Sequence, residues 1–299
     1  MVRRPPRTPR FAARGVCHPS PIASADQITT PPPTEEAAGA RPARPSVDEV
    51  RAVGQPPGLL DRSCEQWGGR MYMRRLSPHV TRALLVHTPL TANGVTWLMI
   101  LTGLATALII TLPGILPAVA AVLLIQLQLL FDCVDGEMAR WQRQRSAVGI
   151  YLDRIAHAVT ESGLPIAIGI RADGGWDQLG TWTIVGFAAG FLILFVKLES
   201  ALVAAARAEA GRPPVRDAPD VTAPRGSGLR RVRRAVDFVP LFRLWHAVEA
   251  SLLVLAAAVV DQVAGDLVAT RVLAVAFLAA GLLTAVGHLV AIVASSRLR

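Results

Sequence analysis

Six apolar runs, each long enough to cross a lipid bilayer, occupy most of the chain after residue 91. They cover approximately residues 92–112, 115–131, 149–170, 179–203, 246–266 and 270–294. A bilayer core is crossed by helices of about 17–25 apolar residues. Its lack of water also requires backbone polar groups to bond within the segment, which an α-helix achieves. Because 52% of the 299 residues are hydrophobic, we predict an all-α integral membrane protein with six transmembrane helices.

The distribution of arginine predicts how these helices are oriented. The N-terminal region, the link at 140–148, the loop at 204–245 and the C-terminus are basic, whereas the connections near 113 and at 171–178 and 261–271 carry few or no basic residues. Basic loops remain in the cytoplasm. We therefore expect a multi-pass protein of the cell membrane with both termini cytoplasmic. This topology and anionic lipid head groups account for the net charge of +9, and no nucleic-acid-binding motif accompanies it.

Composition divides the chain into three regions. Residues 1–58 are rich in arginine and proline without an apolar period, which predicts a disordered N-terminal tail. Residues 59–90 place apolar side chains at near-helical spacing among arginines. That pattern favours an amphipathic juxtamembrane segment, either lying on the inner leaflet or packed on the membrane domain. Residues 91–295 are expected to form the six-helix membrane domain, which includes the cytoplasmic loop at 204–245.

Three carboxylates and an imidazole stand where the second apolar run ends and the third begins. Asp132 and Asp135 are three residues apart, and Asp153 and His157 are four apart, so each pair shares one face of a helix. Charged side chains near membrane depth are energetically costly and mark functional sites. Two helices could aim all four groups at one point. An oxygen-rich cluster of this kind suits hard divalent cations such as Mg²⁺ or Mn²⁺.

This stretch resembles the signature of the CDP-alcohol phosphatidyltransferase family, D-x2-D-G-x2-A-R-x8-G-x3-D-x3-D. Seven of the eight fixed positions match, namely Asp132, Asp135, Gly136, Ala139, Arg140, Gly149 and Asp153. The resemblance, which covers roughly residues 75–295, implies transfer of a substituted phosphate from a CDP-linked donor to an alcohol with release of CMP. It implies a two-metal site for Mg²⁺ or Mn²⁺, with the three aspartates as ligands. The cytoplasmic side would then carry the active site.

The resemblance also assigns substrate contacts. Gly136 and Ala139 would leave space for the CDP moiety, beside the matched Gly149, and Arg140 would bind a phosphate or brace the site. Asn93 and Thr96 are similar to the family's Pro-Asn-x-x-Thr entry to the first helix, although Ala92 replaces the proline. They are expected to lie near the nucleotide; the alternative is that Thr91 or Asn93 simply caps the helix.

Lys197, the one lysine of the chain, lies near the inner end of the fourth run. It is read either as a cation that holds a substrate phosphate or as a snorkelling side chain.

His157 stands where the family signature has its last aspartate. A neutral imidazole accepts a proton near pH 7 and binds metals, but it cannot bridge two metal ions as a carboxylate can. Three interpretations follow: His157 is the general base of an active enzyme, it alters metal binding, or it marks an inactive homologue. Glu161, one turn further on, would partly compensate for the missing carboxylate.

The leading functional hypothesis is therefore a phospholipid-forming transferase that uses CDP-diacylglycerol and a small polar alcohol. A soluble donor such as CDP-inositol or a CDP-amino alcohol is the alternative. A non-catalytic scaffold or transporter is disfavoured, because no internal repeat is visible and the acidic residues lie near one membrane surface. The expected partners are the donor, the acceptor, the lipid bilayer and a second copy of the chain in a homodimer, and no nucleic acid.

Overall fold

The computed structural model describes residues 41–56, 68–144, 146–213, 246–295 and 298. Within these ranges the regular structure is helical and no strand occurs. The first helices are α2 (Val47–Gly54) and α3 (Arg74–His87), with a π-helical turn at Gly69–Met73 before α3. The long helices are α4 (Ala92–Ile110), α5 (Ile115–Trp141), α6 (Ala147–Asp173), α7 (Thr181–Glu209), α10 (Ala247–Ala264) and α11 (Val268–Ala294), and a 3-10 turn (Trp176–Gln178) precedes α7. The predicted all-α class is confirmed.

Five of the described helices are long and apolar enough to cross a membrane, namely α4, α5, α7, α10 and α11. Their outward faces carry large apolar side chains such as Leu116 and Val263, as expected for surfaces that contact lipid. Helix α6 is as long as α5, but it carries the charged residues Asp153, Arg154 and Glu161 and is not among the five. A sixth span at α6 therefore stays a prediction.

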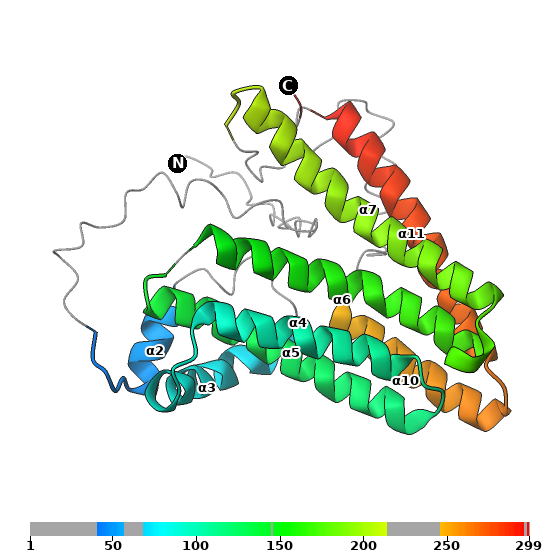
Figure 1. The fold of residues 1–299 in the computed structure, drawn as a ribbon, viewed down its shortest axis with the longest axis horizontal. Coiled ribbons are helices and arrows are strands. Elements are labelled where there is room, and N and C mark those ends of the chain that lie inside the picture. Colours follow the sequence, from blue (N-terminus) through cyan, green and yellow to red (C-terminus); the bar gives the residue numbers. More distant parts are fainter. Residues whose placement is uncertain (1–40, 57–67, 145, 214–245, 296–297, 299) are drawn as a thin grey trace, which may run out of the picture.

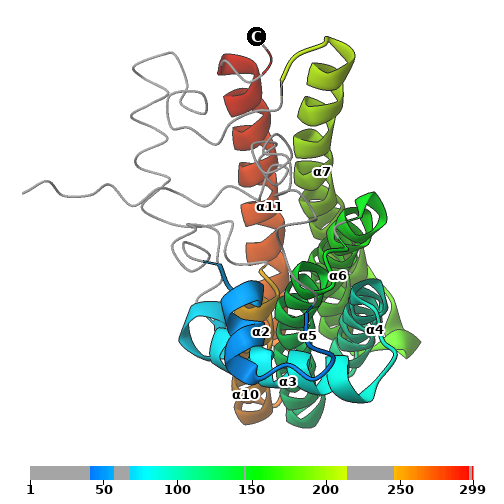
Figure 2. The same ribbon diagram turned by 90° about the vertical axis from the view of Figure 1, so that its left-hand side faces the viewer.

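Helices α4, α5, α6 and α10 run side by side, and α7 and α11 leave them together as a pair (Figure 1). The connections at 111–114, 174–180 and 265–267 lie at one end of the molecule, on the right in Figure 1. The opposite end carries α2, α3 and the link between α5 and α6. Figure 2, viewed toward that end, shows α2 and α3 lying across the ends of the long helices.

The predicted tail at 1–58 is wrong for residues 41–56, which are ordered in the structure, while the rest of that range lies outside the described residues. The reason is a capping box at the start of α2. Ser46 Oγ accepts a hydrogen bond from the Glu49 backbone N–H at 3.2 Å, and Glu49 Oε2 accepts one from the Ser46 N–H at 2.7 Å. These bonds hold the pKa of the Glu49 carboxyl below its ordinary value. Val50 is fully buried.

The juxtamembrane helix α3 packs on the membrane domain, which was one of the two predicted arrangements. Its residues Ser77, Pro78 and Thr81 are buried, and α3 contacts both α2 and α5. The preceding turn and the other face of α3 still expose the apolar side chains of Met71 and Leu76. The helix therefore fastens to α5 while keeping an apolar edge that suits a membrane surface.

A buried carboxylate, Glu137 of α5, joins these N-terminal helices to the motif helix. It is fully buried and accepts hydrogen bonds from Gln55 Nε2 at 2.9 Å, Ser77 Oγ at 2.5 Å and Thr81 Oγ1 at 2.7 Å. Arg74 Nη1 lies 3.9 Å from the same carboxylate. A buried charge is tolerated only when it is paired and hydrogen-bonded in this way. Glu137 thus holds α2 and α3 in register with the helix that carries Asp132.

Replacing Glu137 with alanine is expected to destabilise the protein by about 3 kcal/mol, because two buried donors and one partly buried donor lose a charged acceptor. Thermal unfolding of the full chain in detergent measures this as a lower midpoint temperature. Glu209→Ala, at the exposed end of α7, is the matched control and should leave the midpoint unchanged. Equal midpoints for the two variants would contradict the role assigned to Glu137.

Glycines allow α6 and α7 to approach closely. A Cβ atom added to Gly186 would lie 2.6 Å from the Pro165 carbonyl oxygen, and one added to Gly169 would lie 2.5 Å from that of Trp182. Such contacts exclude any larger side chain, and small residues are the usual means of close helix packing in membranes. The contact holds α6, which carries Asp153 and His157, firmly against α7.

Polar side chains hold together the end of the molecule that carries the connections at 111–114 and 174–180. Arg171, only 1% exposed, donates from Nη1 to the Leu112 carbonyl at 2.6 Å and from Nη2 to the Gly114 carbonyl at 2.9 Å. Asp173 accepts hydrogen bonds from the backbone N–H and the hydroxyl of Thr183, each at 2.7 Å. These bonds satisfy helix-end groups that would otherwise lack partners. They also hold the connection before α7 in place.

Candidate active site and metal centre

A tight turn between α5 and α6 brings the two halves of the motif together. Helix α5 continues through Asp132 to Trp141, and the chain reverses with Arg143 at a positive φ of 54°. Ser146 then caps α6, its Oγ accepting a hydrogen bond from the Gly149 N–H at 3.0 Å. The end of α5 and the start of α6 therefore lie beside each other, so Asp132 faces Asp153.

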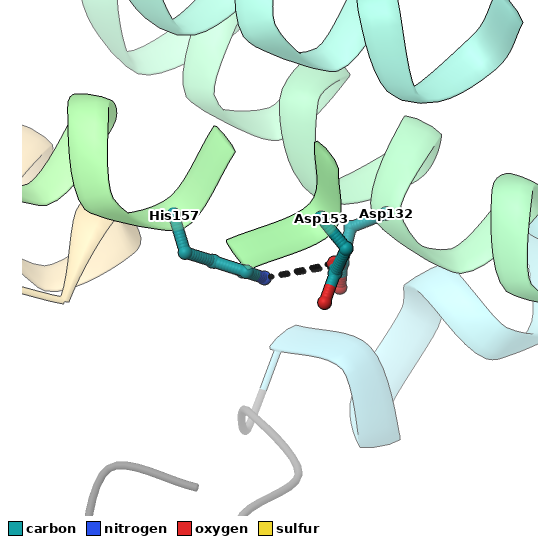
Figure 3. A group of neighbouring side chains, drawn as sticks. All are labelled: Asp132, Asp153 and His157. Carbon is teal, nitrogen blue, oxygen red and sulfur yellow. Dashed lines mark hydrogen bonds and ion pairs between the residues drawn. The ribbon is translucent and has the colours of Figure 1, made fainter. Parts of the chain in front are cut away.

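Asp132, Asp153 and His157 converge at this junction (Figure 3). His157 Nε2 lies 3.2 Å from Asp132 Oδ1 and 3.6 Å from Asp153 Oδ1. One ligand atom from each residue lies within 4.8 Å of the others. The side chains are 27–45% exposed, so the group is open on one side. Of the three carboxylates that were predicted to converge with His157, two, Asp132 and Asp153, do so here.

The chemistry of these atoms shows that a cation fits among them. The two carboxylate oxygens are negatively charged, and the ring nitrogen that faces them is electron-rich unless it carries a proton. The cluster therefore needs a positive charge, supplied by a proton on Nε2 or by a metal ion. Carboxylate oxygens suit Mg²⁺ and Mn²⁺, and imidazole is a common ligand of transition metals. Asp132, Asp153 and His157 could each supply one ligand atom.

Asp135, predicted as a third aspartate ligand, is not one of the three converging residues. Its carboxylate is buried, and Oδ2 accepts a hydrogen bond from Thr96 Oγ1 of α4 at 2.8 Å. Asp135 follows Asp132 by three residues on α5, so it stands about one helical turn further along that helix. The structure therefore places His157 in the group and Asp135 beside it.

The comparison with protein families decides how this arrangement is to be read. Residues 89–215 match the CDP-alcohol phosphatidyltransferase family model. The match covers less than half of the chain but contains the whole motif, so the resemblance is confirmed over that range. It supports the general activity of a CDP-alcohol phosphatidyltransferase domain, the transfer of a phosphatidyl group from a CDP-linked molecule. No curated protein matches the chain at a significant level.

The remaining residues of the family motif contact their own helix or a neighbouring helix around the cluster. An added Cβ on Gly136 would lie 3.1 Å from Arg140 Nη1, and one on Gly149 would lie 2.9 Å from Asn93 Oδ1. Ala139 packs beside the buried apolar residues of α4 and α5. Asn93 thus lies against α6, while Thr96, one turn later on α4, bonds to α5. Both residues therefore connect α4 to the motif helices, and their place near the nucleotide stays a prediction.

The two predicted phosphate contacts already have protein partners. Arg140 Nε donates to the Gly54 carbonyl oxygen at 2.6 Å, which supports the bracing role that was one of its predicted alternatives. Lys197 Nζ lies 2.8 Å from Glu161 Oε2, so it points into the polar region of the protein rather than snorkelling. Phosphate binding by either side chain requires it to exchange or share its present partner.

Glu161 occupies the far side of the imidazole. Its Oε1 lies 3.9 Å from His157 Nδ1, too far for a hydrogen bond, whereas Nε2 faces the two aspartates. The carboxylate thus stands one turn from the cluster, between His157 and Lys197. This is where a compensating charge was expected.

Sequence reasoning missed three buried polar residues near the motif. Glu137 occupies a free position of the signature, and Gln128 precedes Asp132 by one helical turn within an apolar run. Thr160 follows His157 on α6 and accepts a hydrogen bond from Gln128. Polar side chains inside an apolar run were the available signal, because they are costly in a membrane unless they have partners.

Proposed function

We propose that the protein transfers the phosphatidyl group of CDP-diacylglycerol to a small polar alcohol and releases CMP, as a step of phospholipid synthesis. The observation that carries this proposal is the convergence of Asp132, Asp153 and His157 inside the matched family region. Two carboxylates and an imidazole at the end of apolar helices can serve a substrate with a charged diphosphate and an apolar tail. The apolar faces of the surrounding helices suit the acyl chains.

The reaction forms a bond between the acceptor oxygen and the phosphorus of the phosphatidyl group. It breaks the bond from that phosphorus to the CMP oxygen, and the hydroxyl proton leaves the acceptor. His157 is proposed to accept this proton at Nε2, with Glu161 beside the other ring nitrogen. Asp132, Asp135 and Asp153 are proposed to hold Mg²⁺ or Mn²⁺, which when bound would neutralise the diphosphate and the leaving phosphate.

The contacts around the cluster hold these groups in place. Thr96 bonds to Asp135 from α4, and Asn93 lies against Gly149 of α6, so three helices are connected where the nucleotide is proposed to bind. Positioning of this kind supplies much of the rate acceleration in displacement at phosphorus. Gly136 and Ala139 add little side-chain bulk to this surface, which is proposed to receive the CDP moiety.

The test is CMP release by the purified full chain in detergent or lipid nanodiscs with Mg²⁺. CDP-diacylglycerol is compared with CDP-inositol and CDP-ethanolamine as donors, each with a panel of small alcohols and with diacylglycerol as a lipid acceptor. Release from CDP-diacylglycerol alone supports the proposal. Release from a soluble donor alone replaces it with the second candidate, a transferase that uses a soluble CDP-alcohol. No release from any donor contradicts both.

The proposed orientation places the cluster and both termini in the cytoplasm, with the 174–180 connection outside. In a variant without its native cysteines, Gln178→Cys should react with a membrane-impermeant maleimide in intact cells. Arg212→Cys, at the other end of α7, should react only after permeabilisation. Both positions are exposed in the structure, so accessibility reports the side of the membrane. Labelling of Arg212→Cys but not Gln178→Cys in intact cells would reverse the topology.

A further inference from the structure

The segment at 41–55, which lies outside the matched family region, contacts one motif residue from two sides. The Gly54 carbonyl oxygen accepts a hydrogen bond from Arg140 Nε at 2.6 Å, and Arg41 Nη1 donates one to the Arg140 carbonyl oxygen at 2.7 Å. The Arg41 guanidinium also lies over the Trp141 ring, 5.1 Å from its centroid. Both the side chain and the backbone of Arg140 are therefore held by the same N-terminal segment.

Other bonds fix this segment to α3 and α5. Arg82 Nε of α3 donates to the Pro45 carbonyl oxygen at 2.8 Å, before α2 begins. Gln55 Nε2, just after α2, donates to Glu137 Oε1 of α5 at 2.9 Å. Helix α2 thus lies across the end of α5 with a bond at each of its ends (Figure 2). Because Gln55 directly follows Gly54, its bond to Glu137 also fixes the Gly54 carbonyl relative to α5.

The Gly54 carbonyl suits a cationic partner because of its place in α2. Gly54 is the last residue of this helix, and the last carbonyl groups of a helix have no partner within it. The helix dipole also gives this end a partial negative charge, which favours a cation. Arg140 supplies an ionised donor, and hydrogen bonds from ionised donors are stronger than those between neutral groups.

The bond at Nε determines how the rest of the guanidinium is turned. The terminal atoms Nη1 and Nη2 of Arg140 lie over Gly136, where an added Cβ atom would be 3.1 Å and 3.2 Å from them. Gly136 follows Asp132 by about one helical turn, on the surface that is proposed to receive the CDP moiety. A guanidinium binds phosphate through two parallel N–H groups. With Nε bonded to α2, the edge formed by Nη1 and Nη2 is the one that lies on this surface.

We propose that the segment at 41–55 positions Arg140 for the diphosphate of the CDP-linked donor, through the Gly54 carbonyl. The phosphate would be bound at Nη1 and Nη2 while Nε keeps its bond, so the side chain is shared rather than exchanged. Gly54 and Gln55 act here as positioning residues. A long side chain that is already held in its bound geometry loses less conformational freedom when the ligand binds. This inference rests on the proposed transferase function and adds to its site an element from outside the matched family region.

The test measures CDP binding in the presence of Mg²⁺ and donor kinetics of the full chain. An added Cβ atom on Gly54 would lie 3.0 Å from Glu137 Cγ, so Gly54→Val should push the end of α2 away from α5 and from Arg140. The dissociation constant of CDP and the KM for CDP-diacylglycerol should both rise about 3- to 10-fold, as expected when one long side chain must be ordered on binding. The KM of the acceptor should not change.

A double-mutant cycle with Arg140→Gln distinguishes positioning from a general effect on the fold. If α2 acts through Arg140, Gly54→Val should not weaken CDP binding further in the Arg140→Gln background, whereas independent effects would multiply. Binding is measured directly, so the cycle does not depend on the turnover of Arg140→Gln. The matched control is Ala52→Val, which enlarges an exposed side chain of the same helix and should keep the wild-type constants.

Each variant is first checked for the wild-type unfolding temperature. Should Gly54→Val fail this check, Gln55→Ala replaces it in the cycle, because it removes the bond between the end of α2 and Glu137 while Ser77 and Thr81 still donate to that carboxylate.

The outcomes separate this inference from the proposed function. CMP release together with unchanged CDP affinity in the α2 variants would overturn the inference alone. An equal loss of affinity in both Arg140 backgrounds would also overturn it, since α2 would then act on the fold in general. A wild type that neither binds CDP nor releases CMP from any donor would overturn the transferase proposal itself.

Discussion

Asp132→Asn, Asp135→Asn and Asp153→Asn are each expected to lower CMP release by about 10³-fold or more at saturating Mg²⁺ and substrate. A neutral amide keeps the shape of the side chain but is a poor ligand for a hard divalent cation. The loss of one preorganised electrostatic group at a reacting phosphate costs about 10²–10³-fold or more. Asp132 and Asp153 lie in the converging group, and Asp135 lies about one turn after Asp132 on α5. The measurement is the initial rate of CMP release from CDP-diacylglycerol.

The control for these variants is Asp177→Asn, in the exposed turn at the opposite end of the molecule, which should keep wild-type turnover. Removal of the metal with EDTA should abolish activity, and added Mg²⁺ or Mn²⁺ should restore it. Binding of Mn²⁺, followed by its paramagnetic resonance signal, should weaken in the motif variants but not in the control. Full turnover of the wild type in excess EDTA would show that these carboxylates do not act through a metal.

His157→Ala is expected to reduce turnover by about 10²–10⁴-fold, the contribution of a positioned general base. His157→Asp, which restores the usual family signature, should retain more activity than the alanine variant. In the structure, His157 Nε2 faces both Asp132 and Asp153. A carboxylate at position 157 would lie on the same side of α6 and would face the groups that are proposed to react. Turnover of wild type and both variants is compared at several Mn²⁺ concentrations.

The dependence on metal separates the three interpretations of His157. If His157 is the base, His157→Ala should leave the Mn²⁺ concentration that gives half-maximal activity unchanged. If His157 is a metal ligand, His157→Ala should raise that Mn²⁺ concentration, and excess Mn²⁺ should restore part of the turnover. An inactive wild type together with an active His157→Asp variant would identify a degenerate homologue. Wild-type turnover in His157→Ala would show that its position in the motif is structural.

Some features of this protein were determined by the sequence alone. The apolar runs predicted the long helices because a bilayer allows few other structures. The spacing of Asp153 and His157 predicted their shared face because four residues make about one helical turn. The seven matched motif positions predicted the family likeness later found over residues 89–215. Each of these inferences depends on residues close together in the chain, where helix geometry is nearly invariant.

Other features were decided only by the tertiary structure. Glu137 is buried because Gln55, Ser77 and Thr81, far away in the sequence, turn their donors toward it. His157 rather than Asp135 joins the converging group because the rotation of α6 against α5 sets which side chains meet. Thr96 of α4, a third helix, donates a hydrogen bond to the Asp135 carboxylate.

The hydrogen bond from Gln128 to Thr160 likewise needs α4, α5 and α6 to pack together, with Gly103 of α4 as the point of close approach. The helical period places each side chain on a face of its own helix. The rotation and close approach of neighbouring helices, which arise from packing along their whole lengths, decide what that face meets.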